Sequence, residues 1–217
     1  MRGEGPGGVG DCAEMAVKDD EYRALRATIQ QRGTARILVL PLIFVGWAAT
    51  AVATAAVITV AVSTLVPLLV LVAGFEAIFA LHVNVERVGR YLQVYFEAPE
   101  ETARWENVAM AYGRAFAGGG IDALFAPMFW VAALLNFIPA MLSGPMAIDW
   151  AVVGAVHALF VVRVWSARMQ AGRQRAIDLE RYTKLKSESA TRDSRGDENS
   201  LAHSVNGVDQ PQFRRSP

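Results

Sequence analysis

The first half of the chain contains a long stretch without charged side chains. From Ile37 to Phe75 there is no Asp, Glu, Lys or Arg. A helix crosses the hydrocarbon core of a bilayer with roughly 20 apolar residues, so this stretch predicts two spans that fold back on each other. A soluble amphipathic helix keeps one polar face, which these segments lack. The pattern therefore predicts a membrane protein.

Four apolar segments in all have the length and composition of a membrane span, and they fall into two pairs. Short turns join the members of each pair, one near Ser63 and Thr64 and the other at Ser143 to Pro145. The sequence thus predicts an all-α, polytopic membrane protein whose four transmembrane helices form two hairpins. The predicted spans are residues 36–60, 65–81, 121–142 and 148–165.

Helical patterns continue outside the spans. Residues 21–32 place apolar side chains three to four positions apart, which predicts a short amphipathic helix on the membrane surface that ends at Gly33. The second span keeps its helical pattern until Pro99, and a further amphipathic helix is expected over 100–116. The fourth span continues as a helix to Lys186. With these extensions, the transmembrane domain covers residues 21–186.

The two ends of the chain lack such periodicity. Residues 1–20 are rich in glycine and acidic side chains, and residues 187–217 are polar and rich in serine. Segments of this composition bury too little apolar surface to offset the entropy of ordering. We therefore expect a disordered leader and a disordered tail.

Basic residues near the predicted spans indicate the orientation of the chain. They lie before span one, between spans two and three, and after span four, whereas neither short turn carries a Lys or Arg. Cationic segments stay on the cytoplasmic side, so both termini are predicted to be cytoplasmic. The richness in Ala, Val and Arg is typical of a GC-rich bacterial genome, which suggests the bacterial inner membrane. The residues are Arg23, Arg26, Arg32, Arg36, Arg87, Arg90, Arg104, Arg114, Arg163, Arg168, Arg173 and Arg175.

Composition excludes several classes of function. The net charge is zero, which argues against binding of nucleic acid. Cys12 is the only cysteine and there are three histidines, so no catalytic constellation and no metal site stands out. The glycines at 118–120 lack the Lys and Ser/Thr of a phosphate loop. We expect no enzyme activity and no cofactor.

Glu76 and His157 are the polar residues that most need an explanation. Counted from the starts of their spans at Leu65 and Ile148, they lie roughly 16 and 13 Å deep. The similar depths predict a buried pair between spans two and four. Such a pair could bind a proton or a cation. It could equally form a hydrogen bond that fixes the angle between the two helices, which is the more common role.

Other polar residues carry weaker signals. His82 and Glu86 are four apart on one helical face, which is too few donors for a metal and favours an ordinary polar pair. Asn136 in span three is expected to bond a neighbouring helix backbone. The basic cluster Arg168, Arg173 and Arg175 could attract anionic lipid headgroups.

Small residues allow close helix packing in lipid. Ala49, Ala53 and Ala56 in span one, and Gly154 and Ala158 in span four, form faces of this kind. The sequence favours their use in packing within the chain over the formation of a homodimer.

These features favour a non-enzymatic multi-pass membrane protein that presents a cytoplasmic helical surface to a partner. Tyr91, Leu92, Tyr95 and Phe96 are too apolar for a helix alone in water, so either the C-terminal extension or another protein must cover them. The alternative is a small proton- or cation-handling transporter or channel subunit that uses Glu76 and His157. Four spans are few for a complete transporter, so that alternative predicts a homo-oligomer.

Overall fold

The computed structural model describes residues 8–57, 60–97, 108, 124–144 and 146–206, and within these ranges it contains helices and no strand. The helices are α1 (Gly8–Val57), the 3₁₀ helix η1 (Ala61–Thr64), α2 (Leu65–Tyr95), α4 (Ala126–Leu142) and α5 (Ala147–Asn206). The all-α prediction is confirmed. Three helical segments are long and apolar enough to cross a membrane: Met15–Val57, Ala61–Tyr95 and Ala147–Arg192. The apolar helix α4 is shorter, at 17 residues.

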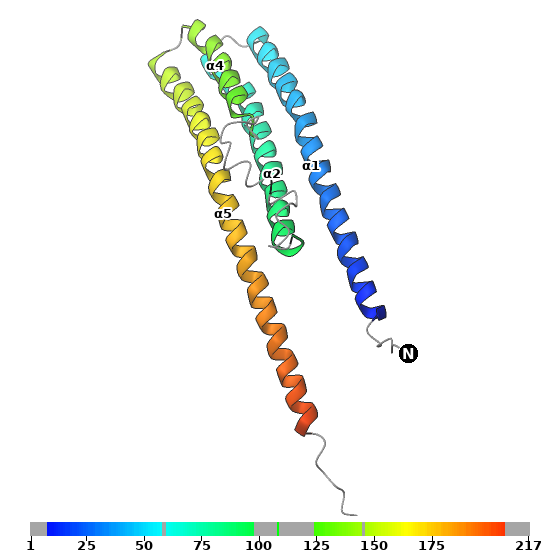
Figure 1. Cartoon of the computed structure of the whole chain (residues 1–217). Helices are drawn as coiled ribbons and strands as arrows, with labels where there is room; N and C mark the ends of the chain where they lie inside the picture. Colours follow the sequence, from blue (N-terminus) through cyan, green and yellow to red (C-terminus); the bar gives the residue numbers. More distant parts are fainter. Residues whose placement is uncertain (1–7, 58–59, 98–107, 109–123, 145, 207–217) are drawn as a thin grey trace, which may run out of the picture.

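The four α-helices run side by side (Figure 1). The turn that leaves α4 and the C-terminal end of α1 lie at one end of the bundle, whereas the N-terminus lies toward the other end (Figure 1). α5 continues past the ends of α2 and α4 and finishes at that same far end. α2 packs against both α1 and α5, and α4 packs mainly against α5 and η1.

Aromatic rings fill the centre of the bundle. The rings of Phe75 in α2, Phe129 in α4 and Phe160 in α5 meet edge to face, with centroids 5.2 to 6.4 Å apart. All three side chains are buried. The outward faces are also apolar, because Leu42, Leu134 and other large side chains are more than 60% exposed. Extended apolar surface of this kind is unusual on a water-soluble monomer and is expected where lipid is the solvent.

α1 packs closely onto α2 at a glycine. A methyl group added at Gly74 would overlap the side chain of Ile43, so only glycine fits there without a shift. The small faces expected from the sequence are not used for packing within the described chain. Ala49 and Ala53 are exposed, and space is open around Gly154. That prediction was wrong because Gly74, which belongs to no small-xxx-small motif, provides the contact.

The helix boundaries differ from those expected at several points. Gly33 lies inside α1 rather than at its end, so the predicted surface helix continues directly into the first apolar segment. α4 begins at Ala126, with proline in its first turn, rather than at Ile121. The amphipathic helix expected over 100–116 falls outside the described residues except for Val108, which is helical.

The ends of the chain also differ from the sequence expectation. Helix α1 starts at Gly8 and α5 runs to Asn206, so residues 8–20 and 187–206 are helical where disorder was predicted. Neither segment contains a proline, and their only glycines are Gly8, Gly10 and Gly196. Extending a helix that is already formed costs far less than nucleating one, which explains how polar segments continue it.

Candidate functional site

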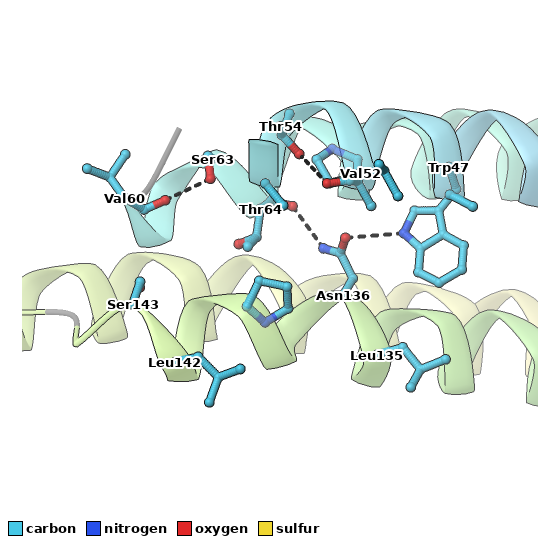
Figure 2. Close-up of a pocket in the computed structure, with 15 residues that line it drawn as sticks. Trp47, Val52, Thr54, Val60, Ser63, Thr64, Leu135, Asn136, Leu142 and Ser143 are labelled. Atoms are coloured by element: carbon cyan, nitrogen blue, oxygen red, sulfur yellow. Dashed lines mark hydrogen bonds between the residues drawn. The ribbon is translucent and has the colours of Figure 1, made fainter. Parts of the chain in front are cut away.

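Asn136 is the centre of a buried polar network that joins four helical elements. Its side-chain oxygen accepts a hydrogen bond from Trp47 Nε1 at 3.2 Å. Its amide nitrogen donates to the backbone oxygen of Thr64 at 2.8 Å and lies 3.1 Å from Nε2 of His157. Figure 2 shows Asn136 reaching from α4 toward Trp47 of α1 and toward Thr64 at the start of α2. The expectation that Asn136 bonds a neighbouring backbone is confirmed, although the backbone oxygen is only one of its three partners.

The hydrogen bonds of His157 define its protonation state. The Nε2 atom faces an amide N–H of Asn136 and must accept, so the ring proton is on Nδ1. Nδ1 lies 2.8 Å from the backbone oxygen of Val153, to which it donates. Every hydrogen bond of the network is thus satisfied by a neutral imidazole. An added proton on Nε2 would face a second donor and break the network.

A cavity of about 660 Å³ lies beside this network, between α1, η1 and α4. Trp47, Thr64 and Asn136 belong to its wall (Figure 2). The rest of the lining is mainly alanine, valine and leucine, with the hydroxyls of Thr54, Ser63 and Ser143. None of the described residues that line it is charged.

Glu76 is paired with Arg163 rather than with His157. A guanidinium nitrogen of Arg163 donates to Glu76 Oε2 at 2.8 Å, and the same guanidinium lies 5.0 Å from the centre of the Phe79 ring. The side chains of Glu76 and Arg163 are 42% and 35% exposed. The prediction of a buried Glu76–His157 pair was wrong: the structure places the two residues in separate networks.

The pairing of Glu76 with His157 was wrong because the depth predicted for Glu76 was wrong. Asn136 bonds both Thr64 and His157, so α2 begins beside the middle of α5's apolar segment and not at its outer end. Arg163 follows Ala147 by sixteen residues, a rise of roughly 24 Å. Its partner Glu76 therefore lies toward the far end of the apolar segment instead of at its centre.

Beyond this ion pair, α1, α2 and α5 continue together as a three-helix stalk. We use this name for residues 18–36 of α1, 82–95 of α2 and 168–186 of α5. Its best-formed contact is bidentate: Arg175 donates to both carboxylate oxygens of Glu86 at 2.8 and 2.9 Å. Arg90 lies 3.8 Å from the same carboxylate, and Arg87 lies 3.8 Å from the buried Asp178. Parallel charge-assisted bonds of this kind fix geometry as well as contributing energy.

His82 connects the stalk to α1. Its Nδ1 atom lies 3.2 Å from a guanidinium nitrogen of Arg36, and its side chain is buried. His82 and Glu86 therefore each have partners on other helices, and their direct pairing stays a prediction. No group of three His, Cys, Asp or Glu residues in the described parts of the chain could hold a metal ion.

The aromatic residues of the stalk are covered by the chain itself. The ring of Tyr91 packs edge to face on Tyr182 of α5, and its hydroxyl donates to Glu21 of α1 at 3.0 Å. Burial and the hydrogen bond to Glu21 raise the pKa of Tyr91 to about 12, so the phenol remains a donor at neutral pH. Phe96 packs on Tyr22 of α1 with a centroid distance of 5.7 Å. The C-terminal extension thus covers part of this surface and α1 covers another part, whereas Tyr95 remains 36% exposed.

The basic cluster expected to face lipid divides in two. Arg175 turns inward to Glu86, whereas Arg168 and Arg173 are exposed on α5. Attraction to anionic headgroups stays a prediction for the two exposed residues. The cluster could not be divided from sequence alone because the rotation of α5 relative to α2 was unknown.

No protein-family model matches the chain, and no curated protein and no solved structure is similar to it. Two features of the described residues indicate what the protein can do. One is the neutral network with its cavity, and the other is the stalk.

Proposed function

We propose that this chain is a non-enzymatic, four-span protein of the cell membrane that presents its three-helix stalk to a protein partner in the cytoplasm. The observation that carries the proposal is the interlocking of α1, α2 and α5 beyond their apolar segments. The Glu86–Arg175 pair and the Tyr91–Glu21 and Tyr91–Tyr182 contacts hold the three helices together. A stalk bound in this way keeps a fixed surface in front of the membrane, as a docking platform requires.

The four-span topology has support from length and charge. The 17 residues of α4 rise about 26 Å, close to the roughly 30 Å of a hydrocarbon core. Trp130 and Trp165 stack at 6.0 Å near one end of the apolar segments, and Phe137 and Trp150 meet at 5.6 Å near the other. Such aromatic belts mark the two membrane interfaces. The basic residues of the stalk favour the cytoplasmic side for both termini.

Cysteine labelling tests the orientation. In a C12A variant, Ser143→Cys in the turn after α4 is expected to react with a membrane-impermeant maleimide added to intact cells. Ser187→Cys in α5 is expected to react only after the cells are permeabilised. The reverse pattern would contradict the orientation, and labelling of both positions in intact cells would contradict the single span that this topology places between them.

Photo-crosslinking tests the platform. A benzophenone amino acid at Leu185, which is 53% exposed on the stalk, is expected to give an adduct of higher mass in cells. Arg175→Glu places two carboxylates together where the bidentate pair was, so it should open the stalk and lower the adduct yield several-fold. Arg173→Glu makes the same charge change on the exposed side of α5 and should leave the yield unchanged. Equal yields from the two variants, or no adduct, would reject the platform.

The ion-handling alternative has less support. It depended on a titratable pair of Glu76 and His157, whereas Glu76 bonds Arg163 and the network of His157 requires a neutral ring. A bound cation would need a further carboxylate or a rearranged network at either place. The platform therefore remains the proposal.

A further inference from the structure

We propose that the groove between α1 and α4 binds the hydrocarbon chain of a neutral, hydroxyl-bearing lipid. This inference does not depend on the platform function, because it concerns the membrane-embedded part of the molecule.

The groove consists of two adjacent cavities. The cavity of about 660 Å³ beside Asn136 shares Trp47 and Leu135 with a second cavity of about 370 Å³. The second cavity extends toward Phe44 and Pro127, and the first extends to Ser143. From Pro127 to Ser143 is sixteen residues, so the groove follows α4 for roughly 24 Å. This is most of the thickness of a hydrocarbon core.

The groove is wide enough for a hydrocarbon chain. The two volumes spread over that length give an average cross-section of roughly 40 Å². A flexible hydrocarbon chain fits, since it is one methylene group across.

The chemistry of the lining fits a neutral head at one end. None of the described residues around either cavity is charged, and apart from Trp47, which both cavities share, polar side chains occur only in the first. There, the hydroxyls of Thr54, Ser63 and Ser143 donate to backbone oxygens of Thr50, Val60 and Ala140. Each oxygen keeps lone pairs that can accept a further hydrogen bond.

A ligand that supplies O–H donors suits these acceptors, whereas a carboxylate or phosphate would meet acceptors and no positive charge. Asn136 already has three hydrogen-bond partners, so it lines the groove without binding the ligand. The second cavity is lined by Phe44, Met128 and Val131 among others, and these side chains offer apolar contact to the hydrocarbon chain. The occupant therefore resembles a monoacylglycerol or a long-chain alcohol in its chemistry.

Photo-labelling of the full-length protein tests the site. The protein is reconstituted in phosphatidylcholine vesicles that contain a trace of monoacylglycerol with a diazirine in the middle of its chain. We expect the labelled peptides to come from residues 44–55 and 127–139, and excess unlabelled monoacylglycerol to compete. A fatty acid probe with the same chain should label these peptides more weakly at pH 8, because its head is an anion.

Two matched substitutions on α1 complete the test. Ala51 lines the groove, and Ala51→Trp should lower labelling about tenfold, the effect of displacing two methylene groups from apolar contact. Ala53 is exposed and lines neither cavity, so Ala53→Trp should leave labelling unchanged. Thermal unfolding of both variants in detergent shows whether they fold. If Ala51→Trp does not fold, competition by unlabelled monoacylglycerol on the wild-type protein decides the question.

Three outcomes would overturn the proposal. Labelling could be spread evenly over the outward faces of all helices, which indicates bulk lipid only. Ala51→Trp and Ala53→Trp could behave alike. Finally, a C12A, Ala51→Cys variant could form a disulfide-linked dimer in vesicles, which indicates that a second copy occupies the groove.

Discussion

Replacing Asn136 with leucine is expected to lower the free energy of unfolding by about 2–4 kcal/mol. The substitution removes three hydrogen bonds at once, to Trp47, Thr64 and His157. It also leaves the partly buried indole N–H of Trp47 and the buried imidazole acceptor of His157 without these partners. Reversible unfolding of the purified protein in mixed detergent micelles measures the change.

Leu134 provides the matched control for this experiment. It lies two positions earlier on α4 and is 68% exposed, so Leu134→Ala should change stability by much less. Asn136→Asp keeps the acceptor for Trp47 but turns a second carboxylate oxygen toward the carbonyl oxygen of Thr64, so we expect it to destabilise the protein at least as much as Asn136→Leu. A stability of Asn136→Leu equal to that of the wild type would show that the network does not hold the helices together.

Replacing Gly74 with leucine is expected to destabilise the protein by about 3 kcal/mol or more, because it forces α1 away from α2. Even a methyl group at this position overlaps Ile43, whose branched side chain packs into the core. The same mixed-micelle unfolding measures the loss. In cells, a lower steady-state amount of protein in the membrane should accompany it.

A second glycine and a compensating change make this prediction specific. Gly154 on α5 has no atom within 4 Å of where a side chain would begin, so Gly154→Leu should be tolerated. The smaller change Gly74→Ala should be partly rescued by Ile43→Ala, which removes the atoms that the new methyl group meets. Equal effects of Gly74→Leu and Gly154→Leu would contradict the close approach of α1 and α2.

Much of the helical framework could be predicted from the sequence, because it depends on local composition. The charge-free stretch from Ile37 to Phe75 indicated two apolar helices with a break between them, and α1 ends at Val57 while α2 begins at Leu65. The continuous pattern after Leu81 indicated that α2 extends beyond its apolar part, which it does to Tyr95. The aromatic residues near Tyr91 indicated that something must cover that extension.

The partners of individual polar residues could not be predicted, because they depend on relative height and rotation. Depths counted from the start of each span assume that all spans begin at one level. Thr64 lies beside His157, so α2 begins closer to the stalk than α5 does. Glu76 therefore bonds Arg163 instead of His157. A basic residue at the edge of a span was read as a signal of orientation alone, although Arg163 is also the counter-ion for Glu76.

The prediction of disorder at the two ends of the chain differs from the structure for another reason. Composition estimates whether a segment can order by itself, and the leader and tail cannot by that measure. In the structure, each is joined without a break to a helix that is already stable, and α1 carries its polar residues as far back as Gly8. The neighbouring helix stabilises these polar segments, and the composition of a segment does not include its neighbour.

The unbroken course of α5 has a mechanical consequence. Its 60 residues extend roughly 90 Å, and roughly 60 Å of that length lies beyond Arg163. The stalk contacts hold α5 as far as Lys186, so only the roughly 30 Å beyond that residue can swing, and a tilt of roughly 10° there displaces the far tip by roughly 5 Å, the rise of one helical turn. Small changes of angle at the end of the stalk therefore become displacements of several ångströms at the tip of α5.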